Sequence, residues 1–251
     1  MHSNSLQQKV AVVAGGAKNL GGLVSRALAA EGARIVVHYN SAGSRPDADA
    51  TVAAVKALGS DAFAIAGDLT KPENCTALFD EAVRRFGGVD IAINNVGKVI
   101  KKPIVQVTEA EYDEMFAINT KAAFFFIKEA GRTLNDGGKI ITLGSSLLAA
   151  FTGYYSVYAG AKGPIEHFTR AAAKEFGSRR ISVNTVAPGP MDTPFFYGAE
   201  TPESVAYLKG ATMNGELTKI EDIAPLIRFL ATEGWWISGQ TIFINGGFAT
   251  R

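Results

Sequence analysis

A tyrosine and a lysine stand four positions apart in the segment Tyr158-Ala159-Gly160-Ala161-Lys162. On a helix, this spacing places the two side chains on one face. An ammonium beside a phenol favours the phenolate, so we expect the tyrosine pKa to fall from about 10 toward the working range of a general acid or base. The pair therefore predicts proton exchange between Tyr158 and a reacting oxygen.

Two further polar residues are candidates for the same chemistry. Ser145 lies thirteen positions before the tyrosine, at the end of a predicted strand, where its hydroxyl could polarise a carbonyl oxygen. Asn119 lies at the centre of an earlier predicted helix. Each also has a simpler structural interpretation, because Ser145 could cap the strand end and Asn119 could bond the backbone at a helix kink. The conjunction of all four residues favours a catalytic site.

The elements that must position these residues follow an alternating pattern. Short Val- and Ile-rich runs alternate with longer helical stretches, as in a parallel sheet covered by helices. We predict one α/β domain over residues 1–251, a doubly wound Rossmann fold whose seven-stranded, mostly parallel sheet has helices on both faces. A long connection at about residues 188–217 predicts a substrate lid. The expected strands are Val10 to Ala14, Ile35 to Tyr39, Ala62 to Ala66, Ile91 to Asn94, Lys139 to Leu143, Ser182 to Ala187 and Thr241 to Ile244.

A glycine-rich turn follows the first predicted strand, over Ala14 to Gly22, and leads into an amphipathic helix. Glycines there let the backbone approach a diphosphate closely, and the helix N-terminus faces the anion. Gly15 and Gly21 lie in this turn, with Asn19 between them. Asn tolerates positive φ better than other non-glycine residues, so the turn can form.

These motifs together resemble the short-chain dehydrogenase/reductase family, and within it the 3-oxoacyl-(acyl carrier protein) reductases. The resemblance spans nearly the whole chain and departs from the family pattern at Ala14, Asn19 and Asn245. It implies that Lys162 also holds the nicotinamide ribose and that Asn119 anchors a water in a proton relay. The residues expected to bind the cofactor are Gly15, Lys18, Asn19, Leu20, Gly21, Tyr39, Asn40, Ser41, Asp68, Leu69, Asn95, Val96, Gly97, Tyr158, Lys162, Pro188, Gly189 and Thr193.

The cofactor is expected to be NADP(H), with NAD(H) possible. An acidic residue at the end of the second strand would repel a 2′-phosphate, and the segment Val37 to Ser41 carries none. Lys18, Ser41 and Arg45 could instead donate to that phosphate. If Lys18 is merely solvated, NAD(H) is the alternative. By the resemblance, Asp68 would accept from the adenine amino group, although it could also cap the helix that starts near Pro72.

We therefore predict hydride transfer between nicotinamide and a ketone, 3-oxoacyl group or secondary alcohol, by a Tyr-Lys-Ser-Asn mechanism. An enoyl reductase is one alternative, because Tyr155 lies seven positions before Lys162. A second alternative is a non-catalytic cofactor-binding redox sensor. Apolar residues expected in the substrate pocket are Leu147, Leu148, Phe151, Tyr154, Tyr155, Met191, Phe195, Phe196, Tyr197 and Met213. Lys98, Lys101 and Lys102 could attract an acidic carrier protein or form a solvated loop.

Composition narrows the remaining function classes. The net charge of +1 and the scattered basic residues predict no nucleic-acid partner, and no apolar run is long enough to cross a membrane. With a polar start to the chain, we expect a cytoplasmic protein. One cysteine and three scattered histidines predict no metal site. Apolar helices around Phe124–Phe126 and residues 155–176, together with the family resemblance, predict a homotetramer that acts on a small molecule.

Overall fold

The structure is a computed structural model that describes residues 5–250. Its centre is a seven-stranded sheet in the order β3-β2-β1-β4-β5-β6-β7, in which every neighbouring pair runs parallel. This arrangement confirms the predicted doubly wound sheet and places all carboxyl strand ends at one edge. The strands are β1 (Val10–Ala14), β2 (Arg34–Tyr39), β3 (Ala62–Ala66), β4 (Val89–Asn94), β5 (Leu134–Leu143), β6 (Ser182–Pro188) and β7 (Thr241–Ile244).

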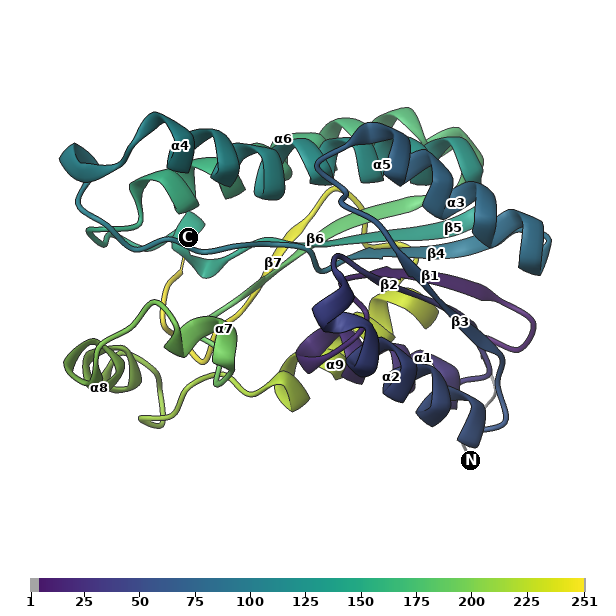
Figure 1. The fold of residues 1–251 in the computed structure, drawn as a ribbon, viewed down its shortest axis with the longest axis horizontal. Coiled ribbons are helices and arrows are strands. Elements are labelled where there is room, and N and C mark those ends of the chain that lie inside the picture. Colours follow the sequence, from purple (N-terminus) through teal and green to yellow (C-terminus); the bar gives the residue numbers. More distant parts are fainter. Residues whose placement is uncertain (1–4, 251) are drawn as a thin grey trace.

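Helices cover both faces of the sheet, as predicted (Figure 1). Alternate residues of β1 show why: Ala11 and Val13 face the core under α1, α2 and α9, while Val10 and Val12 face α3, α5 and α6. Two apolar cores therefore pack against opposite faces of the sheet. The helices are α1 (Asn19–Ala30), α2 (Arg45–Ala57), α3 (Pro72–Phe86), α4 (Glu109–Phe116), α5 (Ala122–Thr133), α6 (Ser156–Glu175), α7 (Pro194–Tyr197), α8 (Pro202–Gly210) and α9 (Ile220–Thr232).

The sequence prediction misses two local features. Strand β5 begins at Leu134 rather than Lys139, because Leu134 pairs with Val89 before a short exposed stretch that contains Gly137 at φ +81°. A π-helical turn over Ala117–Lys121 joins α4 to α5, where the sequence predicts a helix centred on Asn119, with a kink at that residue as the simpler alternative. Such wide turns are rare and often mark functional positions. This one contains Asn119.

The long connection after β6 forms α7 and α8, which project past one end of the sheet in Figure 1. Its ends are held together, because Met191 and Thr218 form a parallel β-bridge. Phe196, Leu208 and Leu217 pack together as a small apolar cluster within the segment. Residues 188–217, which we name the lid segment after their predicted role, thus have a small core of their own beside the carboxyl ends of the strands.

Candidate active site

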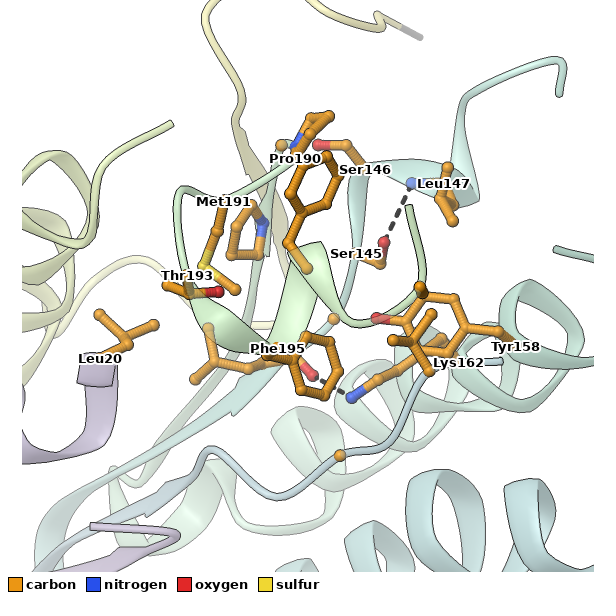
Figure 2. A pocket seen from close by; sticks show the side chains of 18 of the residues that line it. Leu20, Ser145, Ser146, Leu147, Tyr158, Lys162, Pro190, Met191, Thr193 and Phe195 are labelled. Atoms are coloured by element: carbon orange, nitrogen blue, oxygen red, sulfur yellow. Dashed lines mark hydrogen bonds between the residues drawn. The ribbon is translucent and has the colours of Figure 1, made fainter. Parts of the chain in front are cut away.

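A cavity of about 1200 Å³, its mouth included, opens at the carboxyl ends of the central strands. Cofactors and substrates of doubly wound folds bind at this edge. Figure 2 shows Ser145, Tyr158 and Lys162 around this cavity, with Met191 and Thr193 of the lid segment also lining it. The predicted residues that line it are Gly15, Lys18, Asn19, Leu20, Asn95, Val96, Gly97, Ser145, Tyr158, Lys162, Pro188, Gly189 and Thr193.

Tyr158 and Lys162 lie in the first half of α6, and both side chains reach the cavity as the four-residue spacing predicts. The helix is held beside the π-helical turn, because Thr120 Oγ1 donates to the carbonyl oxygen of Ala161 at 2.6 Å. Lys162 Nζ donates to the carbonyl oxygen of Leu143, at the end of β5, at 2.9 Å. Burial lowers the pKa of Lys162 to about 8.

The pKa of Tyr158 corrects one expectation. Burial raises it to about 12, and a hydrogen bond with the Ser145 side chain opposes that shift without cancelling it. Desolvation of the phenolate dominates here, and no sequence spacing reveals it. Tyr158 is therefore a neutral phenol at physiological pH. Ser145 also accepts from the backbone N–H of Leu147 at 3.2 Å, which fixes its side chain at the strand end.

Asn119 lies just behind the cavity lining and is 1% exposed. Its Nδ2 donates to the carbonyl oxygens of Lys98 and Met115 at 2.9 and 3.1 Å, and its Oδ1 accepts from the Lys98 N–H at 3.2 Å. The π-helical turn thus aims this amide at the backbone of the loop after β4. A β-carbon built on Gly97 would lie 3.1 Å from Asn119 Oδ1 and 3.2 Å from Lys162 Nζ. Gly97 therefore lets the two groups approach the same point.

The glycine-rich turn has the backbone that its sequence predicts. Gly15 has φ +67° and Asn19 φ +48°, which confirms that Asn replaces glycine in a left-handed conformation. Gly21 packs so closely that a β-carbon there would lie 1.9 Å from the Gly15 carbonyl oxygen. The N–H of Gly15 donates to His38 Nδ1 at 3.1 Å, while His38 Nε2 contacts the Gly67 carbonyl oxygen at 2.7 Å. His38 thereby connects the turn to the end of β3.

Several predicted cofactor residues lie outside the cavity lining. Asn40 and Ser41 are exposed after β2, and Tyr39 is buried at its end. Lys18 does line the cavity, and its ammonium pairs with Asp47 at 2.9 Å. Leu69 is buried in the core near α3, and Gly21 and Asn119 support the lining from behind.

The Asp68 side chain does not cap α3, and one of its carboxylate oxygens already accepts two hydrogen bonds. Its Oδ1 accepts from the backbone N–H and the hydroxyl of Thr70, at 3.0 and 2.8 Å, while Lys71 occupies the N-cap position. This local turn explains why the alternative of a helix cap was wrong. Whether Asp68 receives an adenine amino group stays a prediction.

The lid segment supplies the opposite wall. Thr193 is 5% exposed, and its hydroxyl oxygen has no hydrogen-bond partner among residues 5–250. A buried hydroxyl without a partner on a cavity wall is suited to a polar ligand. Thr193 and the first N–H groups of α1 offer hydrogen-bond donors to a nicotinamide dinucleotide. The glycine-rich turn leaves space for its phosphates to approach the backbone. The residues present therefore fit that cofactor.

Half of the expected apolar pocket residues line the cavity: Leu147, Tyr155, Met191, Phe195 and Phe196. Leu148, Phe151, Tyr154, Tyr197 and Met213 do not, and Phe151, Tyr154 and Met213 are strongly exposed instead. Sequence reasoning missed the contributions of Val99, Leu143, Gly144, Ser146, Pro190, Ala199, Glu200, Leu208 and Phe248. Leu143 and Gly144 could have been predicted to line the cavity, because they directly precede Ser145 at the strand end. For Glu200 and Phe248 no spacing pattern marks the position.

The three lysines after β4 are ion-paired rather than free. Lys98 pairs with Glu114 at 2.6 Å, and Lys102 pairs with Glu111 at 2.8 Å. Lys101 pairs with Glu200 of the lid segment. The interpretation of a simple solvated basic loop was therefore incomplete.

Within residues 5–250, no helix is both long and apolar enough to span a membrane. The same range contains no cluster of three or more His, Cys, Asp or Glu side chains placed to hold a metal ion.

The parallel sheet and the cleft across its carboxyl edge define a Rossmann-type dinucleotide-binding protein. A family model described as enoyl-(acyl carrier protein) reductase matches residues 15–249. A putative dehydrogenase from Burkholderia cenocepacia, solved with bound NADP, is 58% identical, with a TM-score of 0.96 over 99% of this chain and 96% of that one. The chain belongs to the short-chain dehydrogenase/reductase family of nicotinamide-dependent oxidoreductases.

Two other relatives carry more specific names. A hydroxynaphthalene reductase-like protein of Metarhizium brunneum is 37% identical, with 98% of this chain and 97% of the relative covered. An angucycline C-6 ketoreductase, solved with bound NADP, is 31% identical, with a TM-score of 0.90 over 97% of this chain and 96% of that one. Both matches run the full length of the fold, lid segment included.

Proposed function

We propose that this chain is an NADPH-dependent reductase of ketones that uses Tyr158 as its proton donor. The observation that carries the proposal is the Tyr158 hydroxyl itself. It is kept protonated by burial, hydrogen-bonded with Ser145, and placed on the wall of an apolar cavity at the carboxyl edge of the sheet. A neutral phenol in this position is a general acid for an oxygen that gains negative charge.

Each of the four polar residues has its own role in the proposed reduction. Ser145 and Tyr158 donate hydrogen bonds to the substrate carbonyl oxygen, which orients the carbonyl and makes its carbon more electrophilic. Bound NADPH supplies the hydride for that carbon. Tyr158 then gives its proton to the oxygen, and Lys162 stabilises the resulting phenolate and restores the proton. Asn119 holds the loop after β4 next to the Lys162 ammonium, where a water can pass protons from solvent.

NADP(H) is the cofactor that the cavity and the relatives support best. Lys18 lines the cavity at the start of α1, and the exposed residues after β2 include no carboxylate up to Arg45. Two relatives that share the whole fold were solved with NADP bound. NAD(H) stays the alternative, because Lys18 already has Asp47 as a partner.

The substrate class follows from the lining. Leu147, Met191, Phe195 and Phe196 present aliphatic and aromatic surface around the Ser145 and Tyr158 hydroxyls. Such a wall favours aromatic or alicyclic ketones. Names of relatives, a hydroxynaphthalene reductase-like protein and an angucycline ketoreductase, agree with a fused aromatic ketone. A 3-oxoacyl group on a carrier protein has less support, because the lysines after β4 are neutralised by carboxylates of this chain.

The decisive experiment compares Tyr158→Phe with Tyr155→Phe in NADPH oxidation, on a panel of aromatic ketones and enoyl thioesters. For a ketone reductase, we expect Tyr158→Phe to lower kcat about 10²- to 10⁴-fold, the usual value of general acid catalysis. Tyr155→Phe should keep most of the rate, because the Tyr155 hydroxyl already donates to Glu200. The reverse result on enoyl substrates would establish the enoyl reductase that the family description names.

The redox-sensor alternative is tested in the same assays. Tight NADPH binding by fluorescence, without oxidation across the whole ketone panel, would favour a sensor and contradict the proposed activity. Retention of Tyr158, Ser145, Lys162 and Asn119 around one cavity supports an enzyme, because a sensor has no use for a proton donor.

A homotetramer is the proposed assembly. Phe124 on α5 is 46% exposed and its ring contacts that of Phe168 on α6 edge-on, so an apolar patch lies where these two helices meet. Exposed apolar helix surface of this kind commonly marks a subunit interface. We expect sedimentation equilibrium to give four times the chain mass, and Phe124→Glu to give smaller species. A monomer at micromolar concentration would contradict the proposal.

A further inference from the structure

Glu200 is an unusual residue for the wall of an apolar substrate cavity. It lies in the lid segment between α7 and α8, and its side chain is only 1% exposed. One carboxylate oxygen accepts from the Tyr155 hydroxyl, and the other accepts from Lys101 Nζ. The second oxygen also accepts from Ser204 Oγ at 2.5 Å, within the lid segment itself. The carboxylate is therefore fully engaged and buried.

Two of these bonds leave the lid segment and end on the opposite wall. Lys101 belongs to the loop after β4, and Tyr155 directly precedes α6. The two wall segments are themselves connected, because the N–H of Lys102 donates to the carbonyl oxygen of Tyr154 at 2.7 Å. Tyr155 lies three residues before Tyr158. Glu200 therefore binds the lid segment to a point of the wall that is fixed to α6, the helix that carries the proposed proton donor.

The burial of this ion pair distinguishes it from its neighbours. The Lys101 side chain is 19% exposed, against 48% for Lys98 and 29% for Lys102 in their own pairs. Removing one partner of a buried pair leaves the other charge without compensation and is strongly unfavourable, whereas exposed pairs contribute little. The contact between Lys101 and Glu200 therefore favours one position of the lid segment much more than a surface pair would.

We propose that Glu200 is a positioning residue that holds the lid segment closed over the substrate, by binding Lys101 and Tyr155 across the cavity mouth. This proposal deepens the proposed function, on which it rests. Glu200 takes no part in proton or hydride transfer. It sets the fraction of molecules whose cavity is closed and ready to bind a ketone between Phe195 and the Tyr158 hydroxyl.

Loss of the Glu200 carboxylate should change KM for the ketone much more than kcat. When only a fraction of the protein is in the binding-competent state, the apparent dissociation constant rises by the inverse of that fraction. If loss of the carboxylate leaves about one molecule in ten closed, KM for the ketone rises about tenfold. Saturating substrate restores the closed state, so kcat should change by no more than about threefold. A residue that acts in the chemical step would lower kcat instead.

The experiment measures lid opening and catalysis separately in Glu200→Gln and Lys101→Met. Hydrogen exchange of peptides over residues 194–212 reports lid opening without any substrate or turnover. We expect both variants to exchange there about tenfold faster than wild type, while peptides from β4 and β5 stay unchanged. Glu203→Gln and Lys102→Met are matched controls, because Glu203 is exposed on α8 and Lys102 pairs with Glu111 outside the lid segment. Both controls should exchange as wild type does.

Two further variants guard against a folding defect. Tyr155→Phe removes one crossing bond and keeps the ring, so it should give a smaller increase in exchange. The double variant Glu200→Gln/Lys101→Met should exchange no faster than the faster single variant, since both remove one interaction. Wild-type lid exchange in Glu200→Gln and Lys101→Met would overturn the proposal. So would faster exchange accompanied by an unchanged KM and a collapsed kcat.

These outcomes separate the two proposals. Absence of ketone reduction by the wild-type protein would refute the proposed function, while the exchange of residues 194–212 would still decide whether Glu200 holds the lid segment. Ketone reduction with a wild-type KM in every variant would overturn the role of Glu200 and leave the reductase intact.

Discussion

Lys162 donates its hydrogen bond to the carbonyl oxygen of Leu143, which links the first half of α6 to the end of β5 at 2.9 Å. Leu143 is two residues before Ser145, so this bond sets helix and strand at a fixed distance just where their functional side chains meet. The ammonium is thereby held in place at the cavity wall. The position of Lys162 is a property of the fold and precedes any ligand.

This placement predicts a pH profile for ketone reduction. Burial lowers the pKa of Lys162 to about 8 and raises that of Tyr158 to about 12. Below pH 8 the lysine is charged and the phenol protonated, which is the state that reduction needs. As pH rises through about 8 the ammonium is lost, so kcat for reduction should fall there with a single apparent pKa. Measurement of kcat at saturating NADPH between about pH 6 and pH 10 checks this.

Lys162→Arg separates the charge from its titration, because a guanidinium stays protonated throughout this range. We expect lower activity but a much flatter profile above pH 8. A wild-type profile that is level up to about pH 10 would show that Lys162 does not control the step.

Gly97→Ala tests the close approach of Lys162 and Asn119. The added β-carbon would lie 3.2 Å from the ammonium nitrogen and 3.1 Å from the amide oxygen, so both groups must shift by a few tenths of an ångström. Small misplacements of catalytic groups are costly, and we expect kcat to fall about 10- to 100-fold with the fold intact. Gly160→Ala on α6 is the control, because a β-carbon there meets open space. Equal activity of the two variants would contradict the assignment.

Much of this architecture could be predicted from the sequence because its signals are local. Val- and Ile-rich runs locate the strands, and the spacing of Tyr158 and Lys162 places both on one helix face. The position of Glu200 could not be predicted, since a single carboxylate in a polar loop carries no periodicity and its partners are far away in the chain. The direction of the Tyr158 pKa shift could not be predicted either, because it is set by burial in the folded protein, which no spacing reveals.

Substitution of Lys18 tests the preference for NADPH over NADH. Its ammonium lies at the cavity wall and is shared with Asp47 at 2.9 Å. If it also receives the 2′-phosphate, Lys18→Ala should raise KM for NADPH about tenfold, the value of one charge-assisted contact, and leave KM for NADH within about twofold. Asp47→Asn removes the competing carboxylate and should lower KM for NADPH. Parallel changes for both cofactors would show that Lys18 does not read the phosphate.

His38 supports the glycine-rich turn through its contact with the Gly15 N–H. Burial lowers its pKa from 6.5 to about 4, and its neutral ring accepts from Gly15 and contacts the Gly67 carbonyl oxygen. Since the unfolded chain binds the proton more readily, this residue contributes stability above pH 6.5 that is lost as pH falls toward 4. The loss should amount to on the order of 2–3 kcal/mol in urea unfolding between about pH 7 and pH 4.

His38→Gln should reduce that pH dependence, because glutamine does not titrate, even though the variant is less stable at pH 7. His167→Gln is the matched control, as His167 is exposed on α6 and contacts Arg170. We expect it to follow wild type at both pH values. If His38→Gln loses as much stability on acidification as wild type does, the acid sensitivity arises elsewhere and the neutral imidazole under the turn is not its cause.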